Sequence, residues 1–265
     1  MKQYKNIISL SKNERGILDL DTIKGCKSGL LENEKGCYND CYAFKTAKRY
    51  GIDFSNSVLR SFENEQHKNL IVKQIEKIDM PFIRIGCSGD PSENWEHTIN
   101  IIKQIRESSQ LSLFDISSTK QVVIITRHWS VLTDEQLQKI SKYNICINTS
   151  VSALDNDYLI SKSLNEYERL KPYCKSVLRV VTCDFNELNN IGKEKAEIQR
   201  KLLKNESVID TVFRPSKKND FVVNEIINVK KMGFMKSKAL VSKFNKKTYL
   251  GKCNTCLEMC GLNLK

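Results

Sequence analysis

The sequence lacks any long apolar run. No stretch approaches the roughly 20 apolar residues that a helix needs to span a bilayer, and residues 1–16 contain no apolar segment of signal-peptide length. Linker-like tracts of proline, glycine and serine are also missing, as are long internal repeats. We therefore expect no membrane partner and place the protein in the cytoplasm. The 265 residues suit one large α/β domain with a sizeable core.

Cysteine, in contrast, is abundant. Ten cysteines occur in a chain expected in a reducing compartment, where disulfides are rare. Six form two tight groups, which favours metal binding: Cys26, Cys37 and Cys41 near the amino end, and Cys253, Cys256 and Cys260 near the carboxyl end. The other four lie in apolar or mixed segments and are expected to pack as small hydrophobes: Cys87, Cys146, Cys174 and Cys183.

Short β-branched runs alternate with segments of helical length from residue 80 onward. The runs cover 81–86, 121–126, 144–150, 176–182 and 209–214, and residues 17–23 could form an earlier strand. Strands alternating with helices predict a parallel sheet, and about six βα units are too few for a closed eight-stranded barrel. We therefore expect an open, partial (β/α) barrel over residues 1–250 and a small cysteine-rich, metal-binding cap over residues 251–265.

Several helix starts can be predicted from capping signals. Asp90 precedes Pro91 and has a glutamate three residues on, and Thr133 and Asp184 begin segments of similar capping-box form. Isoleucines at helical spacing predict two amphipathic helices: Ile71, Ile75 and Ile78 in one, and Ile99, Ile102 and Ile105 in the other. The loops that follow parallel strands should then meet at one edge of the sheet.

The first cysteine group supplies three thiolates at a C-x10-C-x3-C spacing. A structural zinc ion prefers four closed ligands, whereas a four-iron cluster held by three cysteines leaves one iron open. Three thiols therefore favour an open [4Fe-4S] cluster. A zinc site completed by a distant ligand and incidental cysteines are the alternatives.

Three motifs in order carry a family resemblance. The runs GCYNDCYAFKTAKRYG (36–51), IRIGCSGDPSENW (83–95) and VVIITRHW (122–129) resemble phage-associated radical S-adenosylmethionine (radical SAM) proteins of unassigned substrate. The resemblance covers roughly residues 20–155 and the cysteine-rich carboxyl end. The commonest spacing of that superfamily is C-x3-C-x2-C with an aromatic residue before the last cysteine. Here Asp40 takes that position and Tyr42 follows the cysteine.

The resemblance implies a chemistry. Cys26, Cys37 and Cys41 would bind a [4Fe-4S] cluster, and S-adenosylmethionine would chelate its fourth iron. One electron from a donor such as flavodoxin or ferredoxin would then cleave the sulfonium to methionine and a 5′-deoxyadenosyl radical, which abstracts hydrogen from the substrate. This first step requires no general base or nucleophile, and the sequence shows no convincing Ser-His-Asp or Cys-His arrangement. We assign no catalytic residue, and His128 also stays unassigned.

The same resemblance suggests residues that contact the cofactor. The turn at Ser88, Gly89 and Asp90 stands where the superfamily carries a Gly-Gly-Glu-type motif that binds the amino group of S-adenosylmethionine. Tyr42 is the candidate for the adenine, and Arg127 for the substrate or cofactor. Ser150 and Ser152 could reach ribose hydroxyls, and Arg179 the carboxylate. The alternatives are that Asp90 only caps a helix, that the serines form turns, and that Arg179 pairs with a local acid.

The carboxyl-terminal region offers a second metal site and a basic segment. Cys253, Cys256 and Cys260 could hold an auxiliary iron–sulfur cluster, or zinc with a fourth ligand from elsewhere. Residues 226–257 contain eight lysines, no acid and three interleaved aromatics, and the formal charge is +12. Such a segment could bind nucleic acid, although a solvated lysine-rich surface is the plainer reading. The alternative function is a zinc-stabilised nucleic-acid-binding protein without catalysis.

Overall fold

The computed structural model describes residues 2–13, 15–32, 41–110, 120–182, 185–205, 208–212, 240–241, 249–250 and 259–264. The chain forms two compact units. The first comprises Met1–Ile147 and Arg169–Lys175, and the second comprises Asn148–Glu168 and Ser176–Lys265. Within the described ranges, each helix is too short or too polar to cross a membrane.

The sheet of the first unit has the order β1-β2-β5-β6-β7. Strand β2 runs parallel to β5 and β5 parallel to β6, while β1 is an antiparallel edge strand. In the second unit the strand order goes on from β7 to β8 and β9, and β9 runs parallel to β8. The bounds are Leu10–Lys12 (β1), Leu18–Leu20 (β2), Phe82–Ile85 (β5), Gln121–Thr126 (β6), Ile145–Ser152 (β7), Lys175–Thr182 (β8) and Val208–Val212 (β9). The predicted mixed α/β class with a mostly parallel sheet is confirmed.

The strand expected over residues 17–23 is wrong in its extent. Strand β2 ends at Leu20, and the chain then enters a separate two-stranded sheet formed by β3 (Ile23–Lys24) and β4 (Val58–Leu59). The break falls at Asp21, whose carboxylate accepts hydrogen bonds from the backbone N–H groups of Gly86 and Cys87 at 3.1 and 2.8 Å. These bonds draw the chain toward the end of β5. A second two-stranded antiparallel sheet joins β10 (Leu240–Val241) and β11 (Tyr249–Leu250).

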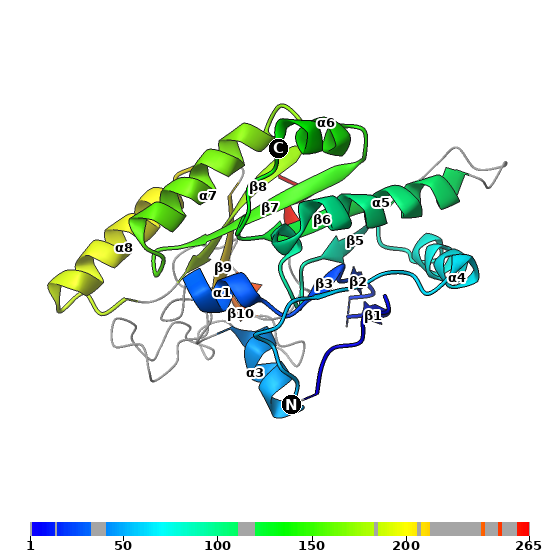
Figure 1. Cartoon of the computed structure of the whole chain (residues 1–265). Helices are drawn as coiled ribbons and strands as arrows, with labels where there is room; N and C mark the ends of the chain where they lie inside the picture. Colours follow the sequence, from blue (N-terminus) through cyan, green and yellow to red (C-terminus); the bar gives the residue numbers. More distant parts are fainter. Residues whose placement is uncertain are drawn as a thin grey trace. The chain divides into compact units, whose positions relative to one another are not determined.

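Helices α4 (Glu65–Glu76), α5 (Trp95–Gln110) and α6 (Asp134–Ser141) cover one face of the first unit's sheet (Figure 1). Their isoleucines and leucines form a single core with alternate residues of the strands. The amphipathic faces predicted around Ile71 and Ile102 are confirmed, because both isoleucines are buried in this core.

The same alternation places polar side chains on the opposite face of the sheet. Leu18 and Leu20 belong to the helix-covered core, so Asp19 between them points to the other side, as Arg84 does in β5. The Arg84 guanidinium donates to both Asp19 carboxylate oxygens, with Nε–Oδ1 and Nη2–Oδ2 distances of 2.7 and 2.9 Å. A two-point ion pair therefore joins β2 and β5 on this face.

In the second unit, α7 (Asp157–Leu170) and α8 (Asn190–Leu202) pack on β7 and β8. Val151, Leu178 and Val180 of the strands share a core with Ile160 and Leu202 of the helices. The predicted helix start near Asp184 is wrong. Helix α8 begins at Asn190, because the Asn189 side chain caps it by accepting a hydrogen bond from Gly192 N at 2.7 Å.

The other predicted helix starts are confirmed. Thr133 and Gln136 form both bonds of a capping box at the start of α6. Asp90 caps a short 3-10 helix, η1 (Pro91–Glu93), which directly precedes α5. Both caps depend on residues two or three positions away, which is why the sequence alone predicted them.

Candidate functional site

The chain segments that follow β2 and β5 cross in close contact in the first unit. Gly25 N donates to Ser88 O at 3.0 Å, and Gly25 and Gly89 form an isolated β-bridge. A Cβ atom at Gly25 would lie 2.2 Å from Asn56 O, and one at Gly89 would lie 2.4 Å from Ile23 O. Both positions therefore require glycine, and the crossing fixes the residue that precedes Cys26.

Cys26 is held from both sides. Its backbone N–H donates to Phe54 O at 2.8 Å, and it directly precedes helix α1 (Lys27–Glu32). In α1, Ser28 N donates to the Glu93 carboxylate at 2.7 Å. Cys26 thus lies on a backbone that three separate segments constrain.

Cys41 is the N-cap residue of helix α3 (Tyr42–Arg49). Cys26 and Cys41 both pack against one small apolar cluster, formed by Ala43, Ala47 and Phe54. Two of the three predicted ligands of the first group are therefore brought to the same place. Cys37 lies outside the described residues.

Burial and the start of α3 act on the Cys41 thiol in opposite directions. Burial raises the pKa of its thiol, while the N–H groups of Phe44 and Ala43 and the cations Arg127 and Lys45 act in the opposite direction by favouring the thiolate. Binding to a metal ion would release the thiol proton and remove the cost of burial. The helix terminus and the two cations would then stabilise the negative thiolate.

Tyr42 and Asp21 connect α3 and β2 to the turn after β5. The Tyr42 hydroxyl donates to the Cys87 carbonyl oxygen, and its side chain stays 65% exposed. Asp21 is buried, and burial raises the pKa of its carboxyl group, although the Cys87 N–H opposes this. Sequence reasoning missed Asp21. The signal available was an acid directly after a strand, at the edge where parallel strands carry functional groups.

Asp90 is buried and accepts four hydrogen bonds. Its Oδ1 accepts from Ser92 N at 2.9 Å, Ser92 Oγ at 2.7 Å and Thr126 Oγ1 at 2.7 Å, and its Oδ2 accepts from Arg127 N at 2.8 Å. A carboxylate offers about four lone-pair sites, so these donors use its usual capacity. Asp90 thus joins the turn after β5 to the end of β6. Its predicted contact with a cofactor stays a prediction.

We expect Asp90→Ala to lower the free energy of unfolding by about 3 kcal/mol, because buried donors from Thr126 and Arg127 lose a charged acceptor. Asp90→Asn should cost about half as much, since its amide oxygen can replace Oδ1 while its NH2 group faces the Arg127 N–H. Urea unfolding measures both effects. The exposed Asp79 provides the control. Equal urea midpoints for Asp90→Ala and Asp79→Ala would contradict this role.

The TRHW run (126–129) begins at the last residue of β6 and forms a packed corner. The Arg127 guanidinium carbon lies 5.4 Å from the Trp129 ring centroid, which is a cation–π distance. His128 is fully buried, has a φ of 53° and lies 5.8 Å from the Trp95 ring. A left-handed histidine is uncommon and persists where its surroundings fix it. Arg127 is therefore presented from a rigid loop.

The predicted residues of the second unit lie on β7, β8 and the carboxyl-terminal turn. Ser150 is buried in β7, and Arg179 is half-buried in β8. The Ser152 hydroxyl donates to Val181 O at 3.0 Å and accepts from Leu154 N, so it has a local structural role. Cys260 lies in η4 (Met259–Gly261) with a φ of 57°, and its carbonyl oxygen accepts from the Asn148 side chain at 3.0 Å.

Other predictions lie outside the described residues. Cys253 and Cys256 fall there, as does most of the basic segment 226–257. Within the described part of the chain, no three His, Cys, Asp or Glu side chains lie close enough together to hold a metal ion. Because Cys37 is outside that part, the three-thiol site stays a prediction.

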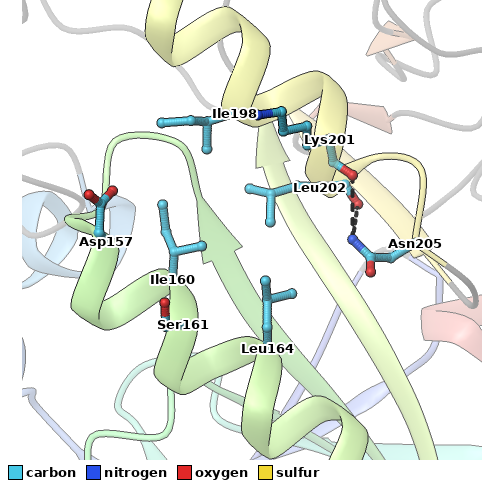
Figure 2. Close-up of a pocket in the computed structure, with 8 residues that line it drawn as sticks. All are labelled: Asp157, Ile160, Ser161, Leu164, Ile198, Lys201, Leu202 and Asn205. Atoms are coloured by element: carbon cyan, nitrogen blue, oxygen red, sulfur yellow. Dashed lines mark hydrogen bonds between the residues drawn. The ribbon is translucent and has the colours of Figure 1, made fainter.

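A hollow of about 290 Å³ lies between α7 and α8 of the second unit (Figure 2). Four of its eight lining residues are apolar, namely Ile160, Leu164, Ile198 and Leu202, and the Asn205 amide donates to Leu202 O at 3.0 Å. None of the predicted site residues lines it.

No protein-family model, curated protein or solved structure matches this chain.

Proposed function

We propose that the protein is a radical SAM enzyme. The packing of Cys26 and Cys41 against one apolar cluster, beside the crossing of the segments after β2 and β5, is the observation that supports this proposal best. Two soft ligands, separated by fourteen intervening residues, are presented together at the edge where parallel α/β sheets carry their functional loops.

The residues of this site fit an iron–sulfur cluster. Cys26, Cys37 and Cys41 would supply three thiolates, and the α3 terminus with Arg127 and Lys45 would offset their negative charge. When bound, the cluster supplies the electron that cleaves S-adenosylmethionine reductively, with flavodoxin or ferredoxin as the class of donor. The open barrel, with the sheet curved around the cofactor, is part of the same proposal.

The chain's own residues would bind and orient the cofactor. The turn between Gly86 and Gly89, which includes Ser88, would let the cofactor approach the backbone closely. Arg127 would present a cation from a fixed loop. Tyr42 offers an exposed ring beside the cysteines. Ser150, Ser152 and Arg179 stay candidates from the second unit. Cys253, Cys256 and Cys260 would hold a second iron–sulfur cluster or zinc.

Anaerobic purification tests the proposal. We expect a brown protein that absorbs near 400 nm, loses its colour in air, and releases 5′-deoxyadenosine when given dithionite and S-adenosylmethionine. A colourless protein with stoichiometric zinc and no 5′-deoxyadenosine release would contradict it. That result would instead favour a zinc-stabilised binding protein.

A further inference from the structure

Helix α3 presents a basic and aromatic face beside the cysteines. Ala43 and Ala47 are buried on one side of the helix. Tyr42, Lys45 and Arg49 recur three and four residues apart, so they lie together on the exposed side. Lys48 and Tyr50 are also exposed. From residue 42 to residue 52 the sequence contains three cations and no acid.

The amino-terminal segment extends this basic surface. Lys2 N donates to Gly51 O at 2.8 Å, and Asp53 N donates to Lys2 O at 2.9 Å, so the segment lies along the residues after α3 (Figure 1). Lys2 and Lys5 are both exposed. Asp53, an acid among the residues after α3, has a carboxylate that accepts two hydrogen bonds from Ser55. The surface therefore gathers four exposed cations, which are Lys2, Lys45, Lys48 and Arg49.

Two aromatic rings lie among these cations. The side chains of Tyr42 and Tyr50 are each 65% exposed. The hydrogen bond from the Tyr42 hydroxyl to Cys87 O ties its ring to the turn after β5. A ring held in this way can stack on a planar group without losing much side-chain freedom.

We propose that this α3 surface, consisting of Lys2, Tyr42, Lys45, Lys48, Arg49 and Tyr50, binds single-stranded nucleic acid. Cations neutralise phosphates, and exposed rings stack on unpaired bases. A membrane partner would need aliphatic side chains to insert, and the exposed side of α3 carries tyrosine, threonine, lysine and arginine. An acidic peptide would use the cations but not the rings. If the protein is the enzyme proposed above, on which this step rests, this surface would deliver its substrate, and the substrate class is single-stranded nucleic acid.

Fluorescence anisotropy with a labelled oligonucleotide of mixed sequence tests the proposal, using the full chain purified anaerobically. DNA and RNA single strands should bind more tightly than the matching duplex, with an affinity that falls as salt rises. The double variant Lys48→Glu, Arg49→Glu should bind single strands about tenfold more weakly, and its salt slope should decrease by about 1.4. Tyr50→Ala should bind at least about fivefold more weakly, while Tyr50→Phe should bind like the parent.

The double variant Lys73→Glu, Lys142→Glu is the matched control. Its two lysines are also exposed at helix carboxyl ends, so it makes the same change in charge at comparable positions. We expect its affinity to stay within about twofold of the parent. The proposal would be overturned if the two double variants lost the same affinity, if duplex bound as tightly as single strands, or if Tyr50→Ala bound like the parent. Tighter binding to anionic vesicles or to polyglutamate than to single strands would also overturn it.

The binding measurement needs neither reductant nor S-adenosylmethionine. A parent protein that binds single strands but releases no 5′-deoxyadenosine would contradict the proposed enzyme while supporting this surface. The opposite outcome, with 5′-deoxyadenosine released and no binding to single strands, would overturn the surface alone.

Discussion

Cys41→Ala should lose the brown colour and release at least about 100-fold less 5′-deoxyadenosine than the parent. Removing one of three thiolates leaves the cluster with too few ligands. Cys26→Ala should have the same effect. The loss should not come from unfolding, since Cys41 is only partly buried and its side chain makes no capping hydrogen bond at the start of α3. Iron content and product release, measured beside urea unfolding, separate these causes.

Cys174→Ala is the control for both variants. Cys174 packs partly buried against the main core, and burial raises the pKa of its thiol to about 12, so it stays protonated. We expect it to keep full iron content and product release. Unchanged iron and product in Cys41→Ala would show that Cys41 is not a ligand.

Gly25→Ala should disrupt the site through the backbone. The new Cβ would lie 2.2 Å from Asn56 O, and Gly25 has a φ of 89°, which L-residues rarely adopt. Steric overlap and the left-handed conformation together should cost about 2–5 kcal/mol of unfolding free energy. Because the same shift moves Cys26 and the bond from Gly25 N to Ser88 O, we also expect most of the bound iron to be lost.

Gly51→Ala separates conformational strain from steric overlap. Gly51 has a φ of 66°, and nothing lies within 4 Å of an added Cβ atom. The variant should therefore lose only about 1 kcal/mol and should keep its iron. Equal losses in the two glycine variants would contradict the importance of the crossing between the segments after β2 and β5.

The parts of the fold that the sequence predicted are those fixed by local patterns. The β-branched run at 121–126 forms β6 over the same residues, and the Thr133 cap depends on a residue three positions away. The break after Leu20 could not be predicted, because the Asp21 carboxylate binds backbone groups 65 and 66 residues further along. Long-range bonds of this kind leave no periodic signal in the sequence.

The candidate site divides in the same way. Thiol grouping indicated Cys26 and Cys41, but no pattern pointed to Phe54, which contributes to the cluster that both cysteines contact. Asp90 was expected to cap a helix because it precedes Pro91 and has a glutamate three residues on, and its bond from Ser92 N confirms the cap. Its bonds to Thr126 and Arg127 span 36 and 37 residues and became visible only in the structure.

In the proposed enzyme, three thiols hold a cluster whose fourth iron is open to S-adenosylmethionine. Electron paramagnetic resonance of the dithionite-reduced protein, recorded with and without S-adenosylmethionine, tests it most directly. We predict a reduced [4Fe-4S] signal whose g values shift when S-adenosylmethionine is added. A signal that S-adenosylmethionine leaves unchanged, or no iron–sulfur signal at all, would contradict a cluster with an open fourth iron.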